Sequence, residues 1–302
     1  MAKKILKTIA RKENTGYWFV LPALLFMVGL VGFPVIYNLI ISTYNENVIT
    51  LGMHNEKFVG LQNYINLFND PIMRTSILNT FVFTIGSIIL QFVIGFGLAI
   101  LFNINFKISK FLRGIMLISW MIPVTVTALL FKFMLSPSGG VIDAILLNLH
   151  LISKPIGWFV DPNMSMWSVI IANTWIGIPF NLILLTTGLS NIPAVLYEAA
   201  EVDGAKISQR FFYITIPQMR ASMLSVLILG VIYTSKVFDL IFVSTGGGPL
   251  STTEVLSTYS YRLSFSQFSF SEGAAVANVL FFILVIVSIG YIKLINKDEV
   301  MS

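Results

Sequence analysis

The sequence predicts an all-α membrane protein, a bundle of six transmembrane helices, and three observations support that fold class. Hydrophobic residues make up 56% of the 302 residues and charged residues only 11%, against roughly 25% charged residues in ordinary soluble domains. The mean hydropathy is +0.85. The chain also contains separate apolar windows that are each long enough to cross a bilayer, whose core needs about 20 helical residues.

The first predicted span follows a basic N-terminus. Residues 1–16 contain Lys3, Lys4, Lys7, Arg11 and Lys12 and precede an apolar run from Tyr17 to about Thr43. This run is too long for the apolar region of a signal peptide and ends in no small-residue cleavage site. We therefore expect a retained first span rather than a cleaved signal.

Five further apolar windows complete one membrane domain over residues 17–295, followed by a tail at 296–302. They cover about Ser76–Phe102, Gly114–Leu135, Met166–Leu189, Ala221–Val243 and Gly273–Ile295. An even number of spans places both termini on the same side of the membrane. That side holds most of the loop lysines and arginines, so the positive-inside rule predicts that both termini are cytoplasmic.

One outer segment is expected to form a short surface helix. The stretch VGLQNYINLFND, residues 59–70, has apolar residues at helical spacing. They are Leu61, Tyr64, Ile65 and Phe68. This spacing favours an amphipathic helix before the second span.

The loop over residues 190–220, between the fourth and fifth spans, is polar and longer than a simple connection requires. Pro193 fits the first turn of a helix, after Asn191 or Ile192 as N-cap. Gly204 is free of the Cβ constraint on turn formation, and a second helix could run over 205–215 until Pro217 helps to end it. From these residues alone, the loop could fold under its own bundle or dock on a soluble partner.

Three short motifs in this loop resemble the EAA loop of permease subunits of binding-protein-dependent ABC importers. They are EAA at 198–200, DGA at 203–205 and ITIP at 214–217. The form YEAAEVDGA, with GGGP at 246–249, is similar to the carbohydrate-uptake branch, which includes the permeases of maltose and glycerol-3-phosphate importers. VGLQNY and the run Asn173-Thr174-Trp175 also fit that branch.

The resemblance implies a type I importer permease fold with a cytoplasmic coupling helix, in the cell membrane of a bacterium. It implies four kinds of partner besides membrane lipid: a second homologous permease, two cytoplasmic ATPase subunits, an extracytoplasmic substrate-binding protein and a carbohydrate substrate, expected to be an oligosaccharide. The implied ATPase-coupling residues are Glu198, Ala199, Ala200, Asp203, Gly204, Ala205 and Pro217. Alternatively, Glu198 could serve only as a carboxylate near a helix N-terminus and Gly204 as an ordinary C-cap.

Polar residues inside the predicted spans are candidates for the substrate pathway: Asn173, Trp175, Asn181, Lys236 and Asp239. Asn173 and Asn181 fall roughly on one helix face, where they could bind sugar hydroxyls or hold the bundle together by interhelical hydrogen bonds. Lys236 and Asp239 could pair on one helix, either lining the pathway or neutralising each other. Lys132 is expected to extend to the outer interface.

The sequence lacks the residues that several classes of function require. The chain has no cysteine and only two distant histidines, His54 and His150, so we expect no metal site. It contains no GxxxxGK[ST], HExxH or GxSxG motif, so we expect no cofactor site and no catalytic residues. In a membrane protein an excess of basic residues does not indicate that the protein binds nucleic acid.

The residues alone are also compatible with two other classes of function. One is a secondary transporter driven by an ion gradient, although such proteins often contain inverted repeats and none stands out here. The other is a membrane scaffold that recruits a soluble protein. Within the resemblance itself, a permease of the glycerol-phosphate type is the alternative to an oligosaccharide importer.

Overall fold

The computed structural model describes residues 17–104 and 108–299, and within these ranges the chain is helical apart from turns and one isolated bridge between Tyr44 and Phe58. The all-α prediction is therefore confirmed. The predicted basic N-terminus at 1–16, Lys107 and the last three residues of the tail lie outside the described residues.

Four described helices are long and apolar enough to cross a membrane. They are Tyr17–Ile41, which includes η1 (Val28–Gly32) and α2 (Phe33–Ile41), then α5 (Pro71–Asn103), α9 (Ser165–Ser190) and α16 (Phe270–Glu299). Two bent helix pairs meet the same criterion when each is taken as one span. The described residues thus provide four to six spanning helices. The four single helices and the first bent pair lie at predicted apolar windows, whereas the second bent pair begins at Ile207, inside the predicted loop over 190–220.

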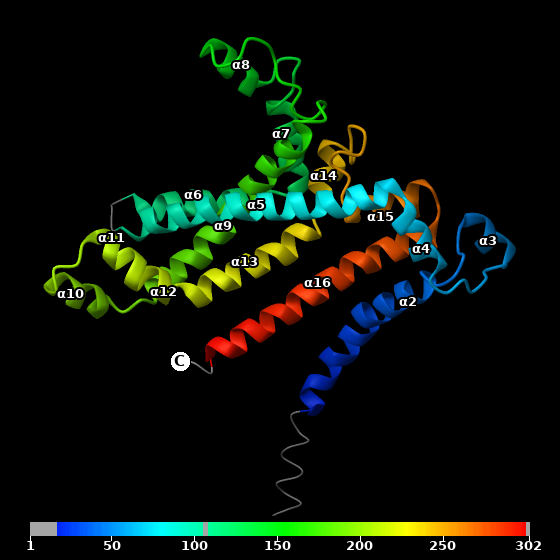
Figure 1. Ribbon diagram of the computed structural model, residues 1–302, viewed down its shortest axis with the longest axis horizontal. Helices are drawn as coiled ribbons and strands as arrows, with labels where there is room; N and C mark the ends of the chain where they lie inside the picture. The colour runs from blue at the N-terminus through cyan, green and yellow to red at the C-terminus, as the bar shows by residue number, and fades with distance from the viewer. Residues whose placement is uncertain (1–16, 105–107, 300–302) are drawn as a thin grey trace, which may run out of the picture.

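Shorter helices connect these elements and build the two ends of the bundle. They are α3 (Val48–Met53), α4 (Gln62–Asn69), α8 (Val141–Asn148), α10 (Ala194–Val202), α11 (Ile207–Arg210), η2 (Phe211–Thr215), α12 (Ile216–Gln218), α14 (Asp239–Ser244), α15 (Leu256–Tyr261) and η3 (Arg262–Ser266). The expected short helix before the second span is α4. Figure 1 shows α10 and α11 at one end of the bundle and α3 at the other.

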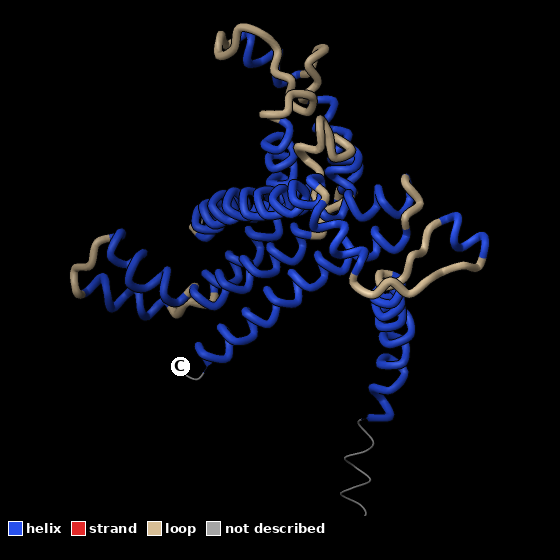
Figure 2. The backbone as a smooth tube through the Cα atoms, turned by 45° about the vertical axis from the view of Figure 1, so that its right-hand side comes forward, coloured by secondary structure: helices blue, strands red, loops and turns tan. Residues whose placement is uncertain are grey.

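The third predicted span is not one straight helix. It consists of α6 (Ser109–Met121) and α7 (Val124–Met134), which meet at 98°. Pro123 causes the break, because proline has no N–H to donate and forces the preceding Ile122 into an extended conformation, here with ψ of 129°. As a result α7 turns away from the direction of α6 and packs against α9 and α14, while α8 projects beyond them (Figures 1 and 2).

The fifth predicted span also ends earlier than the apolar run suggests. Helix α13 (Arg220–Ser235) stops before Lys236, and α14 starts separately at Asp239. The expected pairing of Lys236 with Asp239 on one helix is therefore not formed, and the described residues contain no ion pair between them. On the other side of Met219, α13 meets the segment Ile207–Gln218 at a bend of 62°.

Close packing of α5 along α9 forms the centre of the bundle (Figure 1). Two glycines permit the approach: a Cβ on Gly95 would lie 2.6 Å from the Cβ of Asn181, and one on Gly177 would lie 2.1 Å from the Cδ of Gln91. Small residues allow membrane helices to approach closely and gain van der Waals contact. The crossing therefore requires glycine at position 95, and a side chain at position 177 would displace the Gln91 amide from the Asn173 carbonyl.

We predict that Gly95→Ala lowers the stability of the protein, while Gly97→Ala does not. The new methyl at position 95 would meet Asn181, and overpacking of this kind costs about 1–3 kcal/mol. A Cβ at Gly97, two residues further along the same helix, meets nothing within 4 Å. The measurement is thermal unfolding in detergent, and equal unfolding temperatures for the two variants would contradict the packing described here.

Candidate functional site: an exposed helical turn and an aromatic cavity

The loop that sequence motifs single out forms a helix with a defined C-terminal cap. After α10, Gly204 adopts a left-handed conformation with φ of 76°. The Ala205 N–H donates to the Ala200 carbonyl at 2.8 Å, and the Gly204 N–H donates to the Glu201 carbonyl at 3.0 Å. This pair of hydrogen bonds is the Schellman motif, in which glycine is favoured because it has no Cβ. The C-cap role considered for Gly204 is thus present in the structure.

Two side-chain contacts join α10 to the segment that follows it. Arg210 pairs with Glu201 at 3.0 Å, and the hydroxyls of Tyr197 and Thr215 are 2.8 Å apart. The Tyr197–Thr215 contact is the more shielded of the two, since Thr215 is buried and Glu201 is exposed. These two contacts hold α10 against α11 and η2.

The predicted coupling residues lie mostly on the surface of this element. Glu198, Ala199, Asp203, Gly204 and Pro217 are exposed, and Ala200 and Ala205 are half-buried. Glu198 is not in the first turn of α10, so its alternative role as a helix N-terminal carboxylate is not supported. Within the described part of the chain its side chain has no hydrogen bond or ion pair.

Large apolar side chains also surround this turn. Val202 is 88% exposed and Tyr213 80% exposed, and Val195, Ile207 and Phe212 are exposed as well. The turn borders a hollow of about 390 Å³ that is lined by residues of α10, α11 and η2, among them Asp203 and Arg210. Apolar groups gathered around a charged hollow are typical of a protein-interaction site.

A separate cavity of about 380 Å³ lies among α5, α6, α9 and α13. Its lining residues are Gln91, Trp120, Asn173, Ile176, Gly177, Phe180, Gly230, Tyr233, Thr234 and Val237. Three aromatic rings form a row: the centroids of Trp120 and Phe180 are 6.3 Å apart, and those of Phe180 and Tyr233 are 5.8 Å apart at 78°. The row belongs to three different helices, so the cavity depends on their relative positions.

Amide groups occupy the wall that α5 and α9 form. The Gln91 side chain donates from Nε2 to the Asn173 backbone carbonyl at 3.0 Å. The side-chain Nδ2 of Asn173 is buried and has no partner among the described residues. A buried amide without a partner is costly, so Asn173 has a free donor for a ligand hydroxyl or a water molecule in the cavity.

The structure separates the candidate pathway residues that the sequence grouped together. Asn173 lines the cavity, whereas Asn181 donates to the Gly177 carbonyl at 2.9 Å and packs on α5. Trp175 is exposed on another face of α9. Lys236 is exposed beside Tyr233, with its Nζ 5.1 Å from the ring centroid, and Asp239 is exposed on α14.

No sequence pattern identified the aromatic residues of the cavity as candidate site residues. The spacing Asn173, Ile176, Gly177 and Phe180 follows one helix face and could have identified the wall of α9. Trp120 and Tyr233 lie in apolar surroundings, and no motif marks them in the sequence. Lys132, expected to extend to the outer interface, is exposed and donates to the Val243 carbonyl at 3.2 Å, a contact between α7 and α14.

The GGGP turn at Gly246–Pro249 packs against a charged pair whose carboxylate is buried. Glu254 is buried and lies 3.1 Å from the Arg262 guanidinium. Burial raises the pKa of Glu254, while a hydrogen bond from Thr258 and the charge of Arg262 act in the opposite direction. A Cβ on Gly247 would lie 2.8 Å from the Glu254 carboxyl, so glycine at this position leaves room for the pair.

Comparison with known proteins adds three findings. Residues 91–297 match the family model described as a binding-protein-dependent transport system inner membrane component. The trehalose/maltose transport system permease protein MalF of Thermococcus litoralis is 31% identical over 283 residues, which cover 94% of each chain. The lactose transport system permease protein LacF of Rhizobium radiobacter is 32% identical, covering 91% of this chain and 92% of that protein. These relatives are transport components rather than enzymes.

A solved structure shares the fold. It is the crystal structure of a bacterial ABC transporter involved in the import of the acidic polysaccharide alginate, with a TM-score of 0.78 and 22% identity. The match covers 96% of this chain and 99% of the alginate transporter chain. The arrangement of helices described above is therefore the fold of that transporter chain.

Proposed function

The chain belongs to the family of binding-protein-dependent transport system inner membrane components, and from this premise we propose that it is the permease subunit of an ATP-driven carbohydrate importer. It would form half of the translocation pathway and contain no ATPase of its own. The observation that supports this function best is the exposed turn at α10, whose apolar side chains surround the motif residues.

The proposed coupling path follows the chain. Helix α9 ends at Ser190 and three residues separate it from the start of α10 at Ala194, while Met219 alone separates α12 from α13. The aromatic cavity is lined by these same two helices, through Phe180 on α9 and Tyr233 on α13. A displacement of α10 by a docked ATPase would therefore move two walls of the cavity, which is how nucleotide binding would change access to it.

The chemistry of the cavity suits a carbohydrate. Amide side chains such as Asn173 can hydrogen-bond sugar hydroxyls, and aromatic rings such as Trp120 can face the apolar side of a sugar ring. A volume of about 380 Å³ lies at the lower end of the range for ligand pockets. The named sugars of the relatives, trehalose, maltose and lactose, support an oligosaccharide as substrate.

A second homologous permease would complete the pathway. The helix Tyr17–Ile41 has none of its apolar window buried, and the outer face of α7 exposes Leu129, Leu130 and Phe133. In a membrane, such faces suit lipid or another transmembrane subunit. Two ATPase subunits on the cytoplasmic side and an extracytoplasmic binding protein would be the remaining partners.

The proposed orientation places α10 and both termini in the cytoplasm. Lys206, Arg210 and Arg220 lie in the loop at the α10 end, in agreement with the positive-inside rule. The α3 and α4 end would then face the binding protein.

The docking role of α10 can be tested by cross-linking, because the chain contains no cysteine. A single cysteine in place of Val202 is expected to cross-link to the ATPase subunit in native membranes. A cysteine in place of Ile49 on α3, which is also exposed, is the matched control at the opposite end and should give no such product. Cross-linking at both positions, or at neither, would contradict the proposed docking site.

We predict that Gly204→Asp leaves the protein in the membrane but separates ATP hydrolysis from sugar uptake. The side chain would strain the turn, at a cost of about 1–2 kcal/mol, and would enter the docking surface. Gly60→Asp is the control, because Gly60 also has positive φ, 59°, and only the Phe58 ring comes within 4 Å of its Cβ position. Uptake of a labelled sugar that the wild type imports should fall at least tenfold for the first variant only.

We also predict that Trp120→Ala reduces uptake of that sugar at least tenfold while ATPase subunits still co-purify. The variant removes one ring of the aromatic row, and a stacking surface of this size is typically worth about 0.5–1.5 kcal/mol or more. The matched control is Trp175→Ala, on the exposed face of α9 outside the cavity. Equal loss of uptake in both variants would argue against the cavity as the sugar site.

A further inference from the structure

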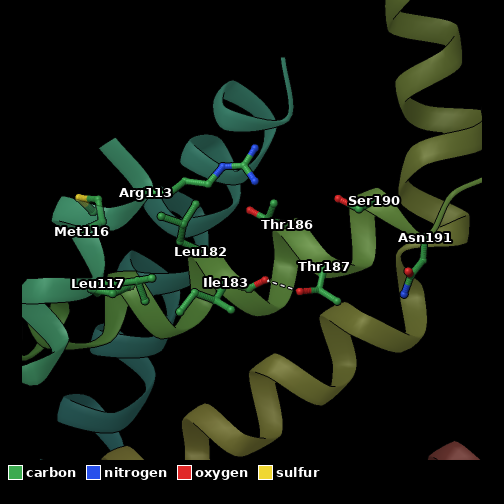
Figure 3. Close-up of a pocket in the computed structure, with 10 residues that line it drawn as sticks. Arg113, Met116, Leu117, Leu182, Ile183, Thr186, Thr187, Ser190 and Asn191 are labelled. Carbon is green, nitrogen blue, oxygen red and sulfur yellow. Dashed lines mark hydrogen bonds between the residues drawn. The ribbon is translucent and has the colours of Figure 1, made fainter. Parts of the chain in front are cut away.

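A second cavity, distinct from the aromatic one, lies between α6 and the last turns of α9 (Figure 3). Its volume is about 360 Å³. Five of its lining residues are polar: Arg113, Thr186, Thr187, Ser190 and Asn191. The rest, including Leu117 and Ile183, form an apolar floor, and Arg113 is the charged residue among the described side chains that line it.

Two buried polar atoms at this cavity have no partner. Thr186 is only 8% exposed, and its Oγ1 makes no hydrogen bond with any described residue. The Nε of Arg113 is likewise buried and unpaired, although the guanidinium donates from Nη2 to the Phe102 carbonyl. Figure 3 shows the guanidinium directed towards Thr186. Buried polar groups of native proteins are normally hydrogen-bonded, so these atoms indicate a missing ligand or water.

The cavity continues the helix faces that form the aromatic site. On α6, Arg113 and Leu117 precede Trp120, and on α9, Phe180 is followed by Ile183 and Thr186. The second cavity therefore lies nearer the α10 end of the bundle. In the proposed orientation it is reached from the cytoplasm.

We propose that this cavity is a second ligand site, which binds an anionic saccharide. The oxyanion, a phosphate or a carboxylate, is received by Arg113, whose planar guanidinium suits both groups. Sugar hydroxyls bond to Thr186, Ser190 and Asn191, and the apolar floor contacts the ring. This second site extends the proposed function and rests on it, because access to the cavity from the cytoplasm follows from the proposed orientation.

The charge of the lining distinguishes the two sites. The described residues that line the aromatic cavity include no charged side chain, and Lys236, outside this lining, lies against the ring of Tyr233. The second cavity adds one cation to a similar set of hydroxyl and amide groups. Its ligand can come from the transported sugar or from a sugar phosphate in the cytoplasm, because both present the same oxyanion and hydroxyl groups.

The test is equilibrium binding to the purified importer complex in detergent, with glucose 6-phosphate, glucuronate and glucose as probes. We expect wild-type protein to bind at least one of the two anions at least tenfold more tightly than Arg113→Gln or Thr186→Val does. Glucose 6-phosphate alone indicates a phosphorylated ligand, and glucuronate alone a carboxylated one. Arg113→Lys should restore part of the affinity, because it retains the charge. Thr174→Val is the matched control on α9, since the Thr174 hydroxyl already donates to the Ile170 carbonyl at 2.7 Å, and it should bind like the wild type.

Two further measurements separate this site from the aromatic cavity and from lipid. Trp120→Ala should lose sugar uptake yet still bind the anions. Loss of sugar transport can therefore be distinguished from loss of anion binding at the second site. Reconstitution with phosphatidylglycerol or phosphatidylcholine tests whether a lipid headgroup occupies the cavity. Any of three results would overturn the proposal. They are no anion binding to the wild type, binding to Arg113→Gln and Thr186→Val that equals binding to the wild type, or occupation of the cavity by phosphatidylglycerol alone.

Discussion

The close contact of α5 with α9 is the constraint on which the rest of the structure depends. Gly95 and Gly177 let the two helices approach, and the Gln91 amide donates to the Asn173 carbonyl at the same crossing. Because Gln91, Asn173 and Gly177 also line the aromatic cavity, one set of residues holds the bundle together and shapes its candidate substrate site. Changes that separate these helices would therefore affect stability and transport together.

The continuity of the chain links this centre to the exposed turn. Helix α9 leads almost directly into α10, and α13 follows almost directly from α12. The cap at Gly204 and the contact of Tyr197 with Thr215 make the intervening loop a defined element. An element of this kind can transmit a displacement, which a flexible connection of the same length could not do.

The sequence predicted the bounds of those helices that fill a whole apolar run. It predicted less well the helices that end or bend within an apolar run. The ranges of α5, α9 and α16 follow the apolar windows within a few residues. The bend at Pro123 and the end of α13 before Lys236 lie inside apolar runs, so hydropathy alone does not reveal them. Pro123 was a visible signal, because proline rarely continues a helix.

The candidate site was predictable only where it lies within one segment. The motif around Gly204 is contiguous, and the helix before it and its glycine cap agree with expectation. The expected N-cap at Asn191 or Ile192 was wrong, because Pro193 is itself the N-cap of α10. Pro217 lies within α12 rather than ending a helix. The aromatic cavity combines Trp120, Phe180 and Tyr233 from three helices, and no spacing within a single sequence brings such residues together. Asn173 was identified because a polar residue in an apolar helix is conspicuous, whereas the aromatic residues resemble their apolar surroundings.

The most direct test of the account is purification of the tagged chain from its native membrane in mild detergent, with mass spectrometry of the proteins that accompany it. The account predicts an ATPase and a second permease with the wild type, and loss of the ATPase from a variant altered at both Glu198 and Gly204. A chain that purifies alone in both forms would contradict the central claim and favour a transporter driven by an ion gradient.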